Sequence, residues 1–204
     1  DEEGAPDLSA VEAATDAASA ALEPGRLIVL ESTTWPGTTR EVVLPRLEVF
    51  EQSLGEDFCL AYSPEREDPG GHSTEDIPRL VAGMDEASLE LALLFYAAIV
   101  PTVHAVDSPE TAECAKLFEN TFRSVNIALA NELKDICDGM GIDAHAVIKA
   151  AATKPFGFMP FQPGPGPGGH CIPIDPQYLS WAARKAGKVA ELVELASKKH
   201  KLQP

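Results

Sequence analysis

The sequence predicts an α/β protein in which a doubly wound layer, residues 1–107, is followed by an all-helical part, residues 108–204. Two observations predict this class. Helical patterns alternate with short apolar strands through the first part. From Ser108 the pattern changes, and after Pro109 neither glycine nor proline interrupts a helix until Gly139. The hydrophobic content of 45% is sufficient for a substantial core.

The first part has the element order of a parallel sheet that is covered by helices. The apolar runs RLIVLES and DFCLAYS are typical of buried strands. The helix before them has Ser9 and Glu12 in capping-box spacing, and Thr38 opens the helix between them. The elements expected here are helices over 8–22, 38–54 and 85–100, and strands over 26–32, 57–63, 79–84 and 101–107.

The second part begins with a long helix. Ser108 is a good N-cap, Pro109 suits the first helical position, and Gly139 and Gly141 mark the end. About 30 residues at 1.5 Å each give a length of about 45 Å, which is typical of helices that span two domains or an interface. Further helices are expected over 143–152, 176–187 and 189–200.

Composition excludes several classes of function. The net charge is −16, which argues against a duplex nucleic-acid partner because such binding needs clustered basic residues. No apolar run approaches the ~20 residues of a membrane-spanning helix. The four cysteines show no C-x-x-C spacing, so neither a zinc site nor a redox pair is indicated. We therefore expect a cytoplasmic protein with no metal.

The stretch GPGPGGHC matches the dinucleotide-loop pattern G-x-G-x-x-G through Gly164, Gly166 and Gly169. Such a loop must follow a strand and open a helix. The preceding TKPFGFMPFQP is not a strand, two prolines remove backbone donors, and HCIPIDP is not expected to start a helix before Asp175. We interpret these glycines as a close backbone approach to a ligand that presents Cys171.

Three residues after the glycines could carry chemistry. Cys171 is either a presented nucleophile or a small buried apolar residue. Asp175 stands four residues later, directly before Pro176, where it could also be an ordinary N-cap. His170 is adjacent to the thiol and would point away from it in an extended loop, so a binding or loop-fixing role is expected.

Polar groups on the long helix and at two strand ends form further candidates. Lys116, Asn120 and Arg123 fall at i, i+4 and i+7, which makes either a row of donors for an oxyanion or a solvated stripe. Hydroxyls follow the strand 26–32 in ESTTWPGTT, and Glu65 and Arg66 follow the strand 57–63. In α/β sheets the carboxyl ends of strands bind ligands, although ordinary caps and turns could also explain both groups.

Taken in order, these segments resemble the UDP-glucose/GDP-mannose dehydrogenase family, whose members oxidise the C6 alcohol of a nucleotide sugar to a carboxylate with two NAD⁺. The resemblance runs from about Pro6 to Ala196, and GGHCIPIDP is similar to the branch that acts on UDP-N-acetylhexosamines. The segments that carry it are ESTTWPGTT, YSPEREDPG, AECAKLFENTFRSVNIALANEL, GID, TKPFGFMPFQPGPGPGGHCIPIDPQYL and ELASKK.

The resemblance implies roles for particular residues. Cys171 would attack the aldehyde of the first oxidation, Lys116 and Asn120 would stabilise the oxyanion, and Asp175 would support proton transfer and orient Lys116 or a water. Glu65 would be the base for thioester hydrolysis. Thr33 would hold the water. Cofactor contacts are implied for Ser32, Thr33 and Glu65, and substrate contacts for Arg66, Arg123, Lys154, Phe156, Gly166, Gly168, Gly169 and His170.

The same resemblance implies a domain organisation. Residues 1–107 would be the end of a Rossmann-like NAD domain, and 108–204 an all-α central domain that dimerises through the helix 109–138. The chain begins with Asp1 rather than Met, and we expect it to lack the glycine-rich NAD loop, a C-terminal domain and turnover on its own. The alternatives are a non-catalytic dimerisation module, a UDP-glucose 6-dehydrogenase, and a thiol acyl-transfer enzyme without NAD.

Overall fold

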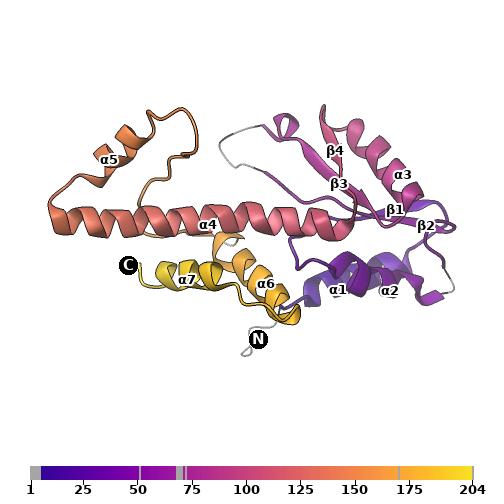
Figure 1. Cartoon of the computed structure of the whole chain (residues 1–204). Helices are drawn as coiled ribbons and strands as arrows, with labels where there is room; N and C mark the ends of the chain where they lie inside the picture. The colour runs from indigo at the N-terminus through magenta and orange to yellow at the C-terminus, as the bar shows by residue number, and fades with distance from the viewer. Residues whose placement is uncertain (1–5, 51, 68–70, 72, 170, 204) are drawn as a thin grey trace. The chain divides into compact units, whose positions relative to one another are not determined.

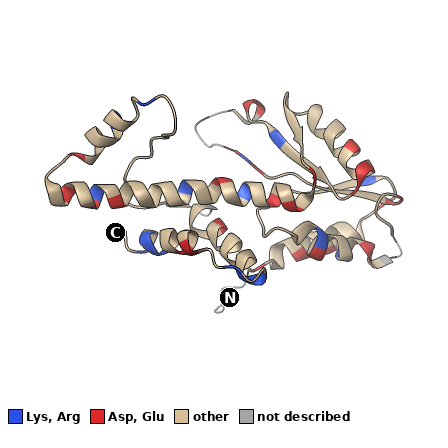
Figure 2. Ribbon diagram, in the orientation of Figure 1, with Lys and Arg blue, Asp and Glu red and all other residues tan. Residues whose placement is uncertain are grey.

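The computed structural model describes residues 6–50, 52–67, 71, 73–169 and 171–203 (Figure 1). The chain divides into two compact units, Asp1–Leu117 and Phe118–Pro204. Acidic residues are spread along the helices of both units, in keeping with 32 Asp and Glu against 16 Lys and Arg (Figure 2). No helix within the described ranges is long and apolar enough to cross a membrane.

Unit 1 is built on a four-stranded sheet in the order β1 (Arg26–Leu30), β2 (Phe58–Tyr62), β3 (Arg79–Gly83), β4 (Val103–Ala105). The pairs β1–β2 and β3–β4 are parallel, as the α/β class requires, and Ile28 lies opposite Leu60. The β2–β3 pair is antiparallel, which differs from the all-parallel expectation. The described part of the β2–β3 connection holds only the short 3₁₀ turn η3 (Thr74–Asp76), whereas a parallel pairing needs a longer crossover, usually helical.

Helices cover both faces of this sheet (Figure 1). The helices α1 (Ser9–Ala20) and α2 (Leu44–Leu47) lie on one face, and α3 (Glu86–Ala97) lies on the other. Successive residues of β2 point to opposite faces, so Leu60 packs with Val43 and Leu47 while Ala61 packs with Tyr96 of α3. The sheet is therefore buried on both sides, as its continuous apolar strands predict.

Two helical segments of unit 1 differ from the sequence expectation. The capping box of Ser9 and Glu12 is wrong, because Leu8 is the N-cap and Ser9 already belongs to α1. The Ser9 N–H instead donates to Asp7 Oδ1 at 2.9 Å. The single helix expected over 38–54 is a succession of η1 (Thr39–Val43, π), α2 and η2 (Glu48–Phe50, 3₁₀). Pro45 has no N–H to donate to the carbonyl four residues earlier, which breaks a regular helix here.

The long helix α4 (Pro109–Met140) agrees with the sequence at both ends. The Thr111 N–H donates to Ser108 Oγ at 3.2 Å, and Gly141 adopts the left-handed conformation, φ +70°, directly after the last turn. The helix begins in unit 1 and continues into unit 2. The domain boundary expected between residues 107 and 108 stays a prediction.

Unit 2 continues with α5 (Ala144–Ala151), α6 (Cys171–Lys185) and α7 (Glu191–His200). Asp143 caps α5 by accepting the His145 N–H at 2.9 Å. Arg184 and Glu194 form an ion pair at 3.0 Å between α6 and α7. The helices expected over 143–152 and 189–200 are therefore present.

The start of α6 corrects a prediction. The segment HCIPIDP was not expected to be helical before Asp175, yet α6 begins at Cys171 and contains Pro176. Pro173 is tolerated because N–H groups of the first turn have no helical acceptor. Pro176 removes one later hydrogen bond, and Gln177 Nε2 donates to the Pro173 carbonyl at 2.8 Å in the same region. Asp175 is thus inside the helix and is not its N-cap.

Candidate active site

The carboxyl ends of β1 and β2 bring two predicted segments together in unit 1. The Glu65 N–H donates to the Glu31 carbonyl at 3.3 Å, so the chain after β2 continues alongside the chain after β1. Ser32 is exposed and Thr33 is half-buried in the segment that follows β1. The two segments that carry these hydroxyl and carboxylate groups therefore lie side by side at the edge of the sheet where parallel strands commonly bind ligands.

Lys116 faces this edge from α4. Its Nζ lies 3.9 Å from Glu65 Oε2, and its side chain is only 8% exposed against 44% for Glu65. The other carboxylate oxygen of Glu65 accepts the Glu67 N–H. A nearly buried cation at the edge of a ligand site can stabilise an anionic intermediate.

A buried carboxylate that the sequence analysis missed holds the segment after β1. Glu113 of α4 is fully buried and accepts hydrogen bonds from the Gly37 N–H at 2.6 Å, the Thr39 N–H at 2.9 Å and the Thr39 hydroxyl at 2.7 Å. Burial raises the pKa of Glu113, and these hydrogen bonds oppose that shift. The available signal was an acidic residue four positions before the core residue Leu117, on the buried side of the helix.

In unit 2, α4 and α6 share a second polar pair. Asn120 Nδ2 donates to Asp175 Oδ2 at 2.5 Å, and both side chains are buried. Asp175 stands four residues after Cys171 on α6, which places both residues on the same face of that helix. The Cys171 side chain and all of His170 lie outside the described residues.

The glycine stretch agrees with the interpretation that it is not a dinucleotide loop. No strand lies in the described residues 152–169 that lead into it and form it, and the Gly164 N–H donates to Asn131 Oδ1 at 2.8 Å. Gly166 and Gly169 adopt φ +98° and +83°, conformations that side chains disfavour, while Gly168 is exposed. One part of the expected context was wrong, since a helix does follow immediately at Cys171.

Among the other predicted substrate residues, Lys154 and Phe156 contact each other. Lys154 Nζ lies 4.8 Å from the centroid of the Phe156 ring, and this ring is 70% exposed. Arg123 is exposed on α4. Arg66 Nη1 donates to the Pro78 carbonyl at 2.8 Å, so this guanidinium holds the loop before β3.

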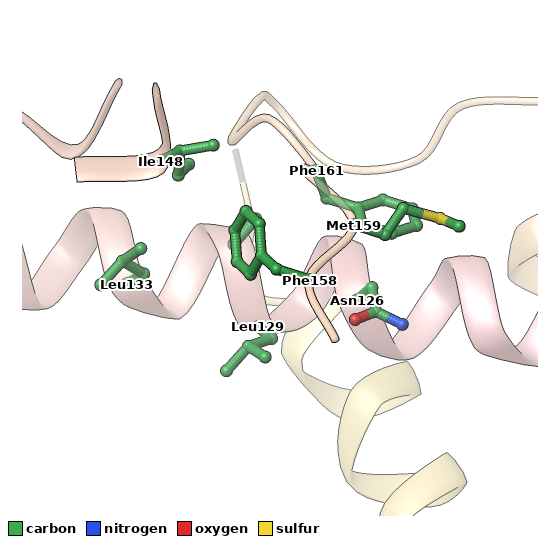
Figure 3. A pocket seen from close by; sticks show the side chains of 8 residues that line it. Asn126, Leu129, Leu133, Ile148, Phe158, Met159 and Phe161 are labelled. Atoms are coloured by element: carbon green, nitrogen blue, oxygen red, sulfur yellow. The ribbon is translucent and has the colours of Figure 1, made fainter. Parts of the chain in front are cut away.

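Unit 2 also has an apolar cavity whose lining includes none of the predicted residues (Figure 3). Side chains from α4, α5 and the segment after α5 surround a volume of about 90 Å³. The Leu129 side chain on its rim is 62% exposed. The residues that line it are Asn126, Leu129, Ala130, Leu133, Ile148, Phe158, Met159 and Phe161. Across the described parts of both units, no three His, Cys, Asp or Glu side chains gather as metal ligands would.

Comparison with known proteins decides the family. Residues 1–100 match the NAD binding domain, and residues 110–200 the central domain, of the UDP-glucose/GDP-mannose dehydrogenase family. The chain belongs to this family. The match over residues 1–100 also confirms NAD as the expected cofactor.

Relatives and solved structures agree with this assignment. The chain is 42% identical over 197 residues to a UDP-N-acetyl-D-glucosamine 6-dehydrogenase of Pseudomonas aeruginosa, covering 95% of the chain and 46% of that protein. A UDP-D-ManNAc dehydrogenase from Pyrococcus horikoshii superposes with a TM-score of 0.90 at 34% identity, over 99% of the chain and 48% of that structure. The UDP-N-acetyl-mannosamine dehydrogenase Cap5O of Staphylococcus aureus superposes with a TM-score of 0.82 at 35% identity, over 97% of the chain and 46% of that structure.

The chain therefore spans about half the length of the relatives that it matches. These structural neighbours confirm the α/β class with a long central helix.

Proposed function

We propose that this chain supplies the catalytic residues of an NAD-dependent UDP-N-acetylhexosamine 6-dehydrogenase in the cytoplasm. The observation that carries the proposal is the pairing on α4: Lys116 lies beside Glu65, and one turn later Asn120 binds Asp175. The substrate class is supported by relatives that are named for UDP-N-acetyl-D-glucosamine and UDP-N-acetyl-D-mannosamine.

The thiol of Cys171 is the nucleophile in this proposal. NAD⁺, when bound, accepts a hydride in each of the two oxidations. After the C6 alcohol has become an aldehyde, the Cys171 thiolate adds to the carbonyl carbon and forms a thiohemiacetal, whose oxidation gives a thioester. Water then adds to the thioester, the C–S bond breaks, and the carboxylate and the thiol are released.

The paired residues of α4 stabilise the charge that develops on oxygen. Asp175 accepts one N–H of the Asn120 amide, which orients the amide and leaves its second N–H for the oxyanion. The ammonium group of Lys116 is the other donor proposed for stabilisation of the oxyanion.

Glu65 and Thr33 serve the hydrolytic step. The Glu65 carboxylate takes a proton from the attacking water, which the Thr33 hydroxyl holds in place. Ser32, Thr33 and Glu65 stand at the carboxyl ends of β1 and β2, where an exposed hydroxyl and a half-exposed carboxylate fit contacts to a nicotinamide cofactor.

The substrate is proposed to lie along side chains that donate hydrogen bonds or expose an apolar face. The Lys154 ammonium and the Phe156 ring suit a nucleotide with negative phosphates and a flat base. Arg66 contributes by holding its loop. The remaining proposed contacts are Arg123, Gly166, Gly168, Gly169 and His170.

The test uses a chimera that adds the parts of the Pseudomonas aeruginosa relative outside the 197 matched residues. NADH formation is followed with UDP-N-acetylglucosamine and with UDP-N-acetylmannosamine. We expect two NADH per sugar acid with one of these substrates and no sugar acid from Cys171→Ser. Cys114→Ser, a change at an exposed cysteine of α4, is the matched control and retains activity. Full turnover by Cys171→Ser would disprove the mechanism, and ester turnover without NAD would favour acyl transfer.

A further inference from the structure

The carboxylate of Glu113 joins α4 to the segment that carries Thr33. All its described hydrogen bonds go to one short stretch, the Gly37 N–H and the N–H and hydroxyl of Thr39. Thr39 is the first residue of η1, and N–H groups at the start of a helix have no acceptor within the helix. Glu113 supplies that acceptor from a residue 74 positions away in the sequence.

The rest of the segment is fixed as well. The Tyr62 hydroxyl donates to the Ser32 carbonyl at 3.4 Å, directly before Thr33. Gly37 has φ +112°, and a Cβ atom built on it would lie 2.8 Å from the Trp35 ring. Trp35 is itself buried. Thr33 therefore lies between an anchor on β2 and an anchor on α4, in a segment with little freedom to shift.

On the helix side, Glu113 precedes Lys116 by three residues, so the two side chains leave α4 on neighbouring turns. The carboxylate that holds the segment and the ammonium that lies beside Glu65 are thus placed by the same stretch of helix. A shift of the segment relative to α4 would change the distance between Thr33 and the Lys116–Glu65 pair.

We propose that Glu113 is a positioning residue that fastens residues 33–39 to α4 and so holds Thr33 in register with Lys116 and Glu65. This inference rests on the proposed function for the roles of those three residues. Replacing the carboxylate by an amide leaves at least one of the donors facing another donor, and an unsatisfied buried donor is unfavourable enough to displace the segment.

The first test uses the chain alone, without cofactor or substrate. Trp181→Phe leaves Trp35 as the single tryptophan, whose emission reports on residues 33–39. In this background we expect Glu113→Gln to shift the emission to longer wavelength. Amide exchange of Gly37 and Thr39 should accelerate at least about ten-fold, because their acceptor is lost.

The matched control is Glu110→Gln, on the same helix. Glu110 pairs with the Arg40 side chain at 2.6 Å and has no described hydrogen bond to the backbone of 33–39, so both readouts should stay unchanged. Thr39→Val removes the hydroxyl donor alone and should give a smaller effect of the same sign, which keeps the test valid if Glu113→Gln unfolds. Unchanged emission and exchange in Glu113→Gln and Thr39→Val would overturn the inference.

The second test separates positioning from simple stability in the chimera described above. We expect Glu113→Gln to lower kcat about 10- to 100-fold with KM changed less than about two-fold, since a small misplacement of catalytic groups affects the reaction more than binding. A looser segment with unchanged kcat would overturn the positioning role. A failure of the proposed function would instead appear as full turnover by Cys171→Ser, whatever the Trp35 signal shows.

Discussion

At the scale of single residues, the chain places two polar pairs on one helix. The Lys116–Glu65 contact is looser, at 3.9 Å with a half-exposed carboxylate, whereas Asn120 and Asp175 are buried and in close contact at 2.5 Å. A buried carboxylate is tolerated only when donors satisfy it, so the second pair contributes to stability as well as to orientation. This pair can be tested by unfolding, without any activity measurement.

Asp175→Asn should lower the free energy of unfolding by about 1–3 kcal/mol, because the amide of Asn120 loses a charged acceptor in a buried place. Urea unfolding of the chain, followed by circular dichroism, measures the change. Asp138→Asn is the control: Asp138 pairs with Lys134 on the exposed side of α4, and its loss should cost less than about 0.5 kcal/mol. Equal losses in both variants would show that the Asn120–Asp175 pair has no special role.

At the scale of elements, local signals located most of the fold. The helix α4 could be predicted from the sequence, because local residue types mark both of its ends. Ser108 and Pro109 favour a helix start, and Gly141 favours a helix end. The antiparallel β2–β3 pair could not be predicted, because it depends on the absence of a helical crossover in the described part of the connection. The early start of α6 could not be predicted either, because Pro173 and Pro176 argue locally against a helix there. The same reason explains the site: Lys116 and Asp175 belong to recognisable segments, whereas the role of Glu113 depends on a partner 74 residues away.

The end of α4 offers a test at this scale. Gly141→Ala should destabilise the chain by about 1 kcal/mol, because φ +70° is unfavourable for any residue with a Cβ atom. Gly139→Ala lies two residues earlier, inside the helix, with no atom within 4 Å of the added methyl group. It should be neutral or slightly stabilising, since alanine favours helix over glycine. Thermal unfolding of the two variants side by side decides the matter, and a Gly141→Ala variant as stable as the parent would contradict it.

At the scale of the whole molecule, several large apolar side chains of unit 2 are exposed. Leu129, Ile136 and Met140 of α4 are each more than half exposed, and Leu129 lines the apolar cavity together with Phe158 and Met159 (Figure 3). Exposed apolar side chains that recur along one helix are typical of an interface. We therefore retain the proposal of a homodimer, in which α4 contacts the second copy of the chain.

Sedimentation equilibrium tests this proposal on the chain itself. The parent should be a dimer at micromolar concentration, and Leu129→Arg should be a monomer. Each copy of the chain would bring one arginine into the symmetric interface, so two charges would be buried without a partner. Leu94→Arg is the matched control: Leu94 is 66% exposed on α3, against 62% for Leu129, and belongs to unit 1. It should leave the dimer intact. A parent chain that sediments as a monomer at every concentration would remove the homodimer, and dissociation by Leu94→Arg alone would place the interface on α3 instead.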